Sequence, residues 1–585
     1  MKYHGKDIEI IGEKTVFGQH TAWIHLLEDD TFLQVLWDDI SLGEEKKGNL
    51  SQVRYVALAA RIKEEIAEKH ILAPYESSLL PLPHQLLILE KVMKAPQTRF
   101  LLADEVGMGK TIEAGLVLKE LKLRGEIKRT LLIVPKSAML QWQNEMKEHF
   151  KENFQIYDSQ LISSLARMFS HLDAEEELNF WRQHNQIIVS TDALKPMEHR
   201  QGWSNKQIEE YNKYRIEAVV NADFDLVIID EAHKMGGSST SVARYQLAET
   251  LSNAVPRLLL LSATPHRGKS DHFRRVLQLL DDDAFSGEGM PTVQEITPYV
   301  LRTEKRNAVD YNGKHLFNKR TTVKLLVPLE ESKYDYQRQL YEDVTAYVRT
   351  SFNKAKENRD TALALVMTMF QKIAGSSTAA IRSALSTRLN GIKNGQIDNA
   401  EDYDPEFDMD EVAEVVPMNY SIQRTYDDRP ETEVIQELID EADRCMELET
   451  DAKAEAMCKV IEKKRMEEGD YHLKVLVFTE FRATQNYLVK YLTSKGFSCQ
   501  TINGAMSLEE RQAALNRFKD DSDIMVSTDA AGESLNMQFC HIVFNYDLPW
   551  NPMAIEQRIG RVDRIGQKFC VVIAVLTNIN SVGHL

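Results

Sequence analysis

The sequence predicts an α/β protein with two parallel-sheet lobes, a helical insertion between them and a small N-terminal module that contains β-strands. Two observations lead to this fold class. Short apolar segments alternate with helical patterns in two separate series along the chain, which is typical of parallel sheets with right-handed helical crossovers. The chain also has 585 residues, which is too long for one compact core and indicates several domains.

The N-terminal module is expected over residues 1–70. Residues 1–48 alternate like short strands separated by turns, and residues 51–69 have the spacing of an amphipathic helix. The strands are expected at residues 15–17, 21–25 and 31–37. This pattern leaves open whether the module docks a protein, contacts DNA or covers the first lobe.

The first lobe is expected over residues 71–305, where five apolar segments are separated by helical patterns. Its strands are predicted at residues 100–103, 130–134, 187–190, 226–229 and 258–261. Ligands of parallel α/β folds bind at the carboxyl ends of the strands. Asp230 and Ser262 stand at two such ends, and a glycine-containing loop follows a third.

A helical insertion and an acidic linker are expected over residues 306–430. Residues 330–392 form long helical patterns, whereas residues 396–430 are acidic and weakly periodic, as in a mobile linker. The second lobe is expected over residues 431–585. Its strands are predicted at residues 475–478, 499–502, 524–527, 542–545 and 571–576.

The composition is that of an ordinary globular protein, with 43% hydrophobic and 27% charged residues. The chain shows neither an apolar run of membrane-spanning length nor the apolar start of a secretion signal, so we expect a cytoplasmic protein without membrane partners. The five cysteines are scattered and argue against a structural zinc site. The net charge of −18 does not exclude nucleic acid, because salt screens charges separated by more than ~8 Å.

The glycine-containing loop reads Asp-Glu-Val-Gly-Met-Gly-Lys-Thr and lies between a predicted strand and a helical pattern. Backbone N–H groups of such a loop surround a polyphosphate, while Lys110 reaches the outer phosphates and Thr111 holds Mg²⁺. This chain has an aspartate where the strict pattern has its first glycine, so a glycine turn with a surface lysine is the alternative. The predicted nucleotide-binding residues are Asp104, Glu105, Val106, Gly107, Met108, Gly109, Lys110 and Thr111.

Paired carboxylates follow the strand predicted at residues 226–229, in the string Asp-Glu-Ala-His. Metal-assisted phosphoryl transfer needs both, because Asp230 would anchor Mg²⁺ and Glu231 would orient and activate the attacking water. The alternative is a helix cap, which an acidic residue at a strand end often provides. His233 either couples the metal site to the other lobe or is a buried histidine with satisfied hydrogen bonds.

The order of these motifs resembles the core of superfamily-two helicases. Leu-Ser-Ala-Thr-Pro at residues 261–265 follows the two motifs above. In the second lobe, the similar segments are residues 475–480, 527–536 and 556–567. The Tyr-Asp-Leu-Pro-Trp-Asn-Pro string and the Arg-Ile-Gly-Gln ending resemble the Swi/Snf-related branch, whose members carry helical protrusions before the second lobe.

Within that branch, the chain is similar to bacterial forms. Residues 83–85 and 103–115 resemble the RNA-polymerase-recycling translocases of the RapA or HepA type. Residues 71–77, 119–125 and 371–377 look more like the translocase subunit of DISARM-type phage-defence systems. The motif set is highly specific for the superfamily and only suggestive for the subfamily.

The resemblance implies two RecA-like lobes that enclose ATP. Gln85 would then read the adenine edge, while Ser262 and Thr264 would transmit the state of the γ-phosphate to a nucleic-acid track. The second lobe would supply Gln557, Arg561 and Arg564. A guanidinium at the transferred phosphoryl group contributes roughly 10³–10⁵ in rate, whereas the alternative for either arginine is a surface ion pair.

Nucleic-acid contacts are predicted where polar residues follow strands, because backbone N–H groups, hydroxyls and lysines there suit phosphate contact without base reading. Trp142 is better explained by packing than by stacking on a base. The candidates are Lys136, Gln141, Trp142, Ser190, Thr191, Thr528 and Asn536.

These patterns and the resemblance predict an ATP hydrolase that uses ATP and Mg²⁺ to move along double-stranded DNA. The setting implied is phage defence with other defence-system subunits, and the alternative partner is RNA polymerase. The competing class is a nucleotide switch that docks partners through the insertion without translocating. Ser534 replaces a glycine of the related motif, and the chain stops shortly after the last predicted strand whereas relatives continue, so we expect a fragment or a chain without its partner-specific domain.

Overall fold

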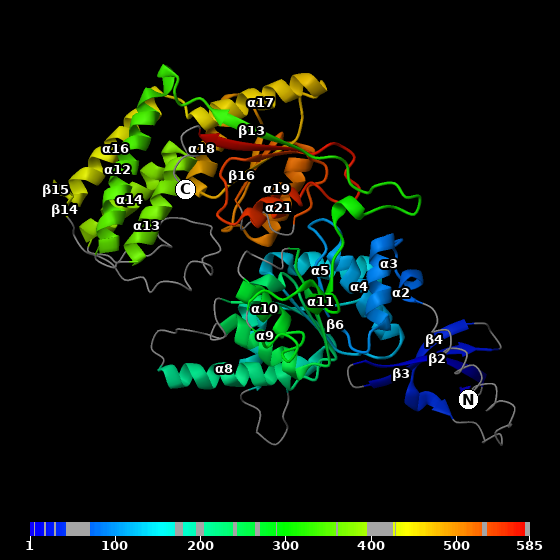
Figure 1. The fold of residues 1–585 in the computed structure, drawn as a ribbon. Helices are drawn as coiled ribbons and strands as arrows, with labels where there is room; N and C mark the ends of the chain where they lie inside the picture. The colour runs from blue at the N-terminus through cyan, green and yellow to red at the C-terminus, as the bar shows by residue number, and fades with distance from the viewer. Residues whose placement is uncertain are drawn as a thin grey trace. The chain divides into compact units, whose positions relative to one another are not determined.

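The structure is a computed structural model that divides into two units, Met1–Leu72 and Ala73–Leu585 (Figure 1). All structural statements below concern the residues that it describes. These are residues 1–4, 6–16, 19–27, 31–41, 71–169, 179–194, 204–237, 243–263, 270–287, 289–357, 361–394, 425–426, 429–528 and 535–578.

The N-terminal unit is an antiparallel sheet in the order β4-β3-β2-β1-β5. Its strands are β1 (Lys2–Tyr3), β2 (Lys6–Val16), β3 (Gln19–Leu26), β4 (Thr31–Leu36) and β5 (Ile40–Ser41). Alternate residues of β3, namely Ala22, Ile24 and Leu26, enter a small core with Ile8 and Val35, as expected for a half-buried sheet. The predicted β-containing module is therefore confirmed, whereas the helix predicted at 51–69 lies outside the described residues.

The first lobe contains a parallel sheet of seven strands in the order β12-β6-β11-β10-β7-β9-β8. The strands are β6 (Arg99–Leu102), β7 (Thr130–Val134), β8 (Gln155–Tyr157), β9 (Gln186–Ser190), β10 (Leu226–Ile229), β11 (Arg257–Leu261) and β12 (Val300–Leu301). The five strands predicted from the sequence are all present, and β8 and β12 are additional. Because every pair is parallel, the carboxyl ends of β6, β11 and β10 meet at one edge.

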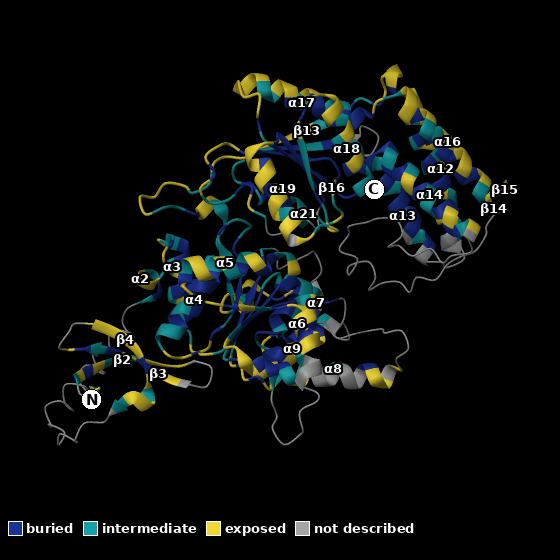
Figure 2. Ribbon diagram, turned by 180° about the vertical axis from the view of Figure 1, so that it is seen from behind, coloured by how far each residue is buried: buried dark blue, intermediate teal, exposed yellow. Residues whose placement is uncertain are grey.

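Helices before and between these strands bury the sheet (Figure 2). They are α2 (Ala73–Glu76), α3 (Pro83–Lys94), α4 (Lys110–Leu123), α5 (Met139–Phe150), α6 (Ser159–Phe169), α7 (Thr191–Leu194), α8 (Asn205–Val220), α9 (Ala243–Ala254), α10 (Ser270–Gln278) and α11 (Val293–Ile296). The central strands β7 and β10 are buried along their whole length, which explains why they read as continuous apolar runs.

The second lobe contains a parallel sheet of six strands in the order β13-β20-β19-β16-β18-β17. The strands are β13 (Thr321–Val327), β16 (Val475–Thr479), β17 (Cys499–Ile502), β18 (Ile524–Thr528), β19 (Ile542–Asn545) and β20 (Val572–Asn578). Its helices are α17 (Ala452–Glu468), α18 (Arg482–Ser494), α19 (Leu508–Asp520) and α21 (Pro552–Ile559). The edge strand β13 precedes the helical insertion, whereas the other five strands of this sheet follow it.

The insertion is a bundle of α12 (Asp335–Glu357), α13 (Thr361–Ser376), α14 (Thr378–Asn394) and α16 (Glu431–Leu448) with its own apolar core. Phe481, which precedes α18 of the second lobe, belongs to that core. Most of the acidic linker predicted at 396–430 lies outside the described residues, which include only β14 (Thr425–Tyr426) and β15 (Arg429–Pro430) there. The described part of the chain holds no helix that is both long and apolar enough to cross a membrane.

Candidate active site

The glycine-containing loop connects β6 to α4 and is shaped by two left-handed glycines, Gly107 with φ 87° and Gly109 with φ 92°. Residues with a Cβ rarely adopt this conformation. Lys110 is the first residue of α4, and its ammonium donates hydrogen bonds to the main-chain oxygens of Asp104 (2.9 Å) and Glu105 (3.4 Å). Burial lowers the pKa of Lys110 despite the opposing charge of nearby carboxylates. The lysine thus points into the loop.

Gln85 lies behind this loop and is buried. Its side-chain oxygen accepts a hydrogen bond from the Leu82 N–H (2.9 Å), and its amide donates to the Met108 main-chain oxygen at 3.4 Å. A Cβ added at Gly109 would lie only 2.8 Å from the Gln85 amide nitrogen. Gln85 therefore braces the loop, and its reading of adenine stays a prediction.

A buried cluster beneath the loop was not found from the sequence. Asp104 accepts a hydrogen bond from the Thr303 N–H at 2.6 Å, while the fully buried Glu113 on α4 lies beside it. Burial raises the pKa of both carboxyls, that of Glu113 well above its usual value, which favours one proton held between the two carboxyls. The His84 ring lies 3.1 Å from the Met108 main-chain oxygen. The departure from the strict glycine pattern at position 104 thus has a structural role.

Asp230 follows β10 at the same sheet edge. One carboxylate oxygen accepts a hydrogen bond from the Trp142 indole N–H (2.9 Å), and the other accepts the N–H of Glu231 (2.8 Å). Burial and the neighbouring charge of Glu231 raise the pKa of Asp230 to about 6. Trp142 is 2% exposed, so the packing interpretation is confirmed and Trp142 offers no face to a base. Its role is to orient Asp230, which the sequence did not indicate.

Glu231 has a left-handed backbone with φ 49° and ψ 43°. Such a conformation costs energy in a residue other than glycine and is found mostly at functional sites. Its carboxylate lies 3.1 Å from the His233 Nδ1 atom, which is also 2.9 Å from the Ser262 hydroxyl. Burial alone would raise the pKa of Glu231, but the hydrogen bond and charge of His233 lower it overall. The carboxylate is therefore ionised at neutral pH and can accept a hydrogen bond from water, while its lowered pKa makes it a weak base.

The structure therefore links the paired carboxylates to the Ser-Ala-Thr motif through His233. Both His233 and Ser262 are fully buried, which fits a packed connection between the two strand ends. Thr264, the second residue predicted for this motif, lies outside the described residues.

A loop of the second lobe touches the glycine-containing loop. The Ile565 N–H donates to the Gly107 main-chain oxygen at 3.4 Å. A Cβ added at Gly107 would lie 2.6 Å from the Asp563 main-chain oxygen, and one added at Gly560 would lie 2.0 Å from Val106 Cγ1. We call residues 560–567 the arginine loop, because it carries Arg561 and Arg564. The two loops lie in direct van der Waals contact.

The arginine loop begins where α21 ends. Arg564 donates hydrogen bonds to the main-chain oxygens of Gly560 (2.8 Å) and Leu535 (3.4 Å), and its Cγ would lie 3.2 Å from a Cβ added at Gly107. Burial, together with the charge of Arg561, lowers the pKa of Arg564 to about 10. Gln557 is half-buried on α21. The action of these side chains on a phosphoryl group stays a prediction.

Thr111 and Asp230 fit a magnesium ion by the chemistry of their donors, because a hydroxyl and a carboxylate are hard oxygen ligands. The hydrogen bonds of Asp230 come from an indole and a main-chain N–H. The charges of this carboxylate and of Glu231 act on the Lys110 ammonium and partly oppose the lowering of its pKa by burial. These groups would surround the phosphates of a bound nucleotide.

The remaining nucleic-acid candidates divide by exposure. Lys136 after β7 and Asn536 in the second lobe are exposed. Ser190 is buried and its hydroxyl accepts the Ala193 N–H at the start of α7, whose first residue is Thr191. Thr528 is fully buried at the end of β18, so the structure exposes neither the Ser190 nor the Thr528 hydroxyl to a phosphate. Ser534 lies outside the described residues.

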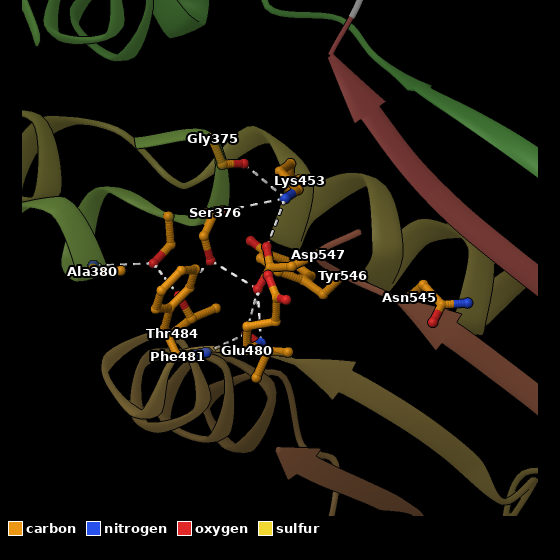
Figure 3. Close-up of polar contacts among 12 residues, drawn as sticks. Gly375, Ser376, Ala380, Lys453, Glu480, Phe481, Thr484, Asn545, Tyr546 and Asp547 are labelled. Carbon is orange, nitrogen blue, oxygen red and sulfur yellow. Dashed lines mark hydrogen bonds and ion pairs between the residues drawn. The ribbon is translucent and has the colours of Figure 1, made fainter. Parts of the chain in front are cut away.

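A second buried network joins the insertion to the second lobe (Figure 3). The Asp547 carboxylate accepts hydrogen bonds from Lys453 (3.2 Å), from the Ser376 hydroxyl (2.9 Å) and from the Thr479 hydroxyl. Lys453 also donates to the Gly375 main-chain oxygen at 2.9 Å. These residues come from four separate stretches of the chain, and their meeting was not foreseen from the sequence.

Comparison with known proteins agrees with the two-lobe arrangement. A family model described as SNF2-related domain matches residues 52–372, and one described as helicase conserved C-terminal domain matches residues 452–566. The chain is 29% identical over 512 residues to the uncharacterized ATP-dependent helicase YqhH of Bacillus subtilis, a match that covers 84% of this chain and 74% of that protein.

It is also 28% identical over 512 residues to the RNA polymerase-associated protein RapA of Proteus mirabilis, covering 84% of this chain and 47% of that protein. The chain thus spans about half the length of the RapA relatives that it matches. Among solved structures, the helicase domain of Pyrococcus furiosus Hef matches with a TM-score of 0.46 and 15% identity, covering 86% of this chain and 96% of that one.

Proposed function

Because this chain belongs to the SNF2-related family and carries a helicase C-terminal domain, we propose that it is an ATP-driven motor that moves along double-stranded DNA. Membership of the family implies ATP hydrolysis. The observation that best supports the proposal is the contact between the glycine-containing loop of one lobe and the arginine loop of the other, through Gly107 and Ile565. Hydrolysis at such a seam depends on closure of the lobes, so it can be coupled to movement.

The residues of the first lobe have distinct roles in this proposal. Lys110 neutralises charge on the outer phosphates, and Thr111 and Asp230 hold the magnesium ion, which offsets phosphate charge when bound. Glu231 accepts a proton from the attacking water, which its ionised state allows. Trp142 keeps Asp230 oriented through the indole hydrogen bond.

The second lobe supplies further positive charge at the reacting phosphoryl group, in addition to Lys110 of the first lobe. Arg564 already lies beside the glycine-containing loop, since its Cγ would be 3.2 Å from a Cβ added at Gly107. Arg561 precedes it in the same loop. If each lobe binds the DNA backbone, alternate opening and closing of the lobes moves their two DNA-binding surfaces relative to each other.

Phosphate release with linear duplex DNA, single-stranded DNA, RNA or no polymer tests this function, with Glu231→Gln as the inactive control. We expect duplex DNA to be the strongest activator and the motor to displace a triplex-forming oligonucleotide from the duplex. A rate indifferent to DNA would favour the nucleotide switch. A preference for single-stranded DNA or RNA would instead favour a strand-separating helicase.

RNA polymerase is the partner that the comparisons favour, because several relatives are named RNA polymerase-associated protein RapA. Other subunits of a phage-defence system are the second candidate, from the similar segments at residues 71–77, 119–125 and 371–377. Gel filtration of the protein with purified polymerase distinguishes the two. Stable co-migration supports the first candidate, and its absence at micromolar concentrations supports the second.

A further inference from the structure

We propose that Lys305 is a positioning residue that holds the arginine loop against the glycine-containing loop. This inference rests on the proposed function, because it concerns the geometry of the same hydrolytic site. Lys305 lies in neither loop and belongs to none of the motifs that the sequence indicated. It follows β12, the edge strand of the first lobe.

Lys305 contacts both sides of the seam. Its main-chain N–H donates to the carboxylate of Glu105 at 3.0 Å, and Glu105 is the second residue of the glycine-containing loop. Its ammonium donates to the Asp563 carboxylate at 2.7 Å and to the Asp563 main-chain oxygen at 2.9 Å. One residue therefore ties its own lobe's phosphate loop to the arginine loop of the other lobe.

The position of Asp563 makes this contact important for the arginines. Asp563 stands between Arg561 and Arg564 in the sequence, and its main-chain oxygen is the atom that a Cβ at Gly107 would meet at 2.6 Å. If Lys305 were absent, the Asp563 carboxylate would compete with phosphate for the neighbouring guanidinium groups. By pairing with this carboxylate, Lys305 removes one competing acceptor from the neighbourhood of the two arginines.

The contact between Lys305 and Asp563 depends on closure of the lobes, because both side chains are buried while the two loops touch. The side chain of Lys305 is 14% exposed and that of Asp563 is 5% exposed, and the ammonium also lies over the Phe317 ring, 4.9 Å from its centre. When the lobes separate, both charges return to water and the contact is lost. The pair therefore contributes to the closed arrangement and to its alignment, and adds nothing to the open one.

A second ion pair in the same region provides a matched control. Arg320 forms a bidentate pair with Glu556 at 2.8 and 2.9 Å, and both pairs line one cleft of about 750 Å³. Arg320 directly precedes β13, and Glu556 lies on α21, so both belong to the second lobe. This pair is exposed and does not cross the seam.

The test compares Lys305→Met with Arg320→Met. We expect Lys305→Met to lower kcat for ATP hydrolysis roughly ten- to hundredfold, the scale of a misplaced catalytic group, with the Kd for ATP changed less than about threefold. We expect Arg320→Met to retain kcat. Lys305→Arg should restore part of the loss, because it keeps the charge across the seam.

A second readout reports closure directly. Dyes placed on the exposed side chains of Lys94 in the first lobe and Lys519 in the second should show a smaller closed fraction with ATP in Lys305→Met than in Arg320→Met. Melting curves exclude a folding defect, and Asp563→Asn provides an independent variant with the same expected direction. Equal kcat and equal closure in the two methionine variants would overturn the proposal.

The same experiment separates this proposal from the proposed function. If DNA fails to stimulate hydrolysis in the natural protein, the DNA motor is refuted. The effect of Lys305 on the basal rate and on closure is still measured, and it decides the role of Lys305 by itself.

Discussion

The network around Asp547 makes a quantitative prediction about the junction between the insertion and the second lobe. We expect Asp547→Ala to destabilise this junction strongly, because the substitution removes the only carboxylate that the Lys453 ammonium contacts within the described residues. The Lys453 side chain is 7% exposed and that of Asp547 is 4% exposed. After the change, Lys453 would retain only the main-chain oxygens of Gly375 and Ser376 as acceptors.

The size of this destabilisation depends on which hydrogen-bond donors find another acceptor once the Asp547 carboxylate is removed. The Ser376 hydroxyl already contacts the Thr484 hydroxyl at 2.8 Å, so its loss is compensated. The Thr479 hydroxyl and the Glu480 N–H lose their acceptor, in addition to the buried ammonium. Breaking one side of a buried ion pair costs about 3–5 kcal/mol, and the two neutral donors place Asp547→Ala at the upper end of that range.

Hydrogen exchange of peptides from α13, β16 and α18 measures the local free energy of opening at this junction. The double variant Lys453→Met/Asp547→Leu should recover most of the loss, because no uncompensated charge remains in it. Glu467→Ala serves as a control, since its exposed pair with Lys464 should contribute little to stability. If the double variant opens as easily as the single one, a buried unpaired charge is not the cause.

Three further predictions concern the candidate active site and the buried carboxyl pair beneath its loop. Glu231→Gln should bind ATP normally and hydrolyse it roughly 10²–10⁴ times more slowly in single-turnover assays; near-normal turnover would refute its role as base. Gly560→Ala should lower ATP turnover without changing ATP affinity, because its Cβ would lie 2.0 Å from Val106 Cγ1 and push the lobes apart; unchanged turnover would show that the contact is not needed. Glu113→Gln should leave the free energy of unfolding equal or higher, because the amide replaces the proton shared with Asp104. The raised pKa of Glu113 means that the folded natural chain holds a proton which the unfolded chain releases above about pH 4.5, so its stability falls as pH rises. The advantage of Glu113→Gln in urea unfolding should therefore grow with pH, and a constant difference would contradict a shared proton.

The sequence predicted the buried strands well because a strand covered on both faces is apolar along its whole length. All ten predicted strands of the two lobes are present. The three that were missed differ physically. Strands β8 and β12 are too short to give a pattern, and β13 lies at an edge, where most of its residues are exposed and Lys324 interrupts the apolar run.

The candidate site was predictable only where its residues form local motifs. The glycine-containing loop and the paired carboxylates are contiguous strings, so their chemistry can be read directly. By contrast, the Trp142–Asp230 hydrogen bond joins residues 88 apart, and the Lys305–Asp563 pair joins residues 258 apart. No local pattern encodes such pairs. Glu113 is a charged residue within an apolar helical stretch. This position weakly indicates that its carboxyl has a buried partner.

Helix α21 connects the arginine loop to the buried network around Asp547. A displacement of the arginine loop can therefore reach that network through α21. The arginine loop leaves the carboxyl end of α21, while Arg558 on the same helix donates to the Asp547 main-chain oxygen at 2.7 Å and to the Asn545 side chain at 3.1 Å. The Asp547 carboxylate in turn holds Ser376 of the insertion. Because packed cores transmit displacement instead of absorbing it, a loop drawn toward the nucleotide must carry α21 and the insertion with it. These contacts connect the arginine loop to the insertion through Arg558 and Asp547.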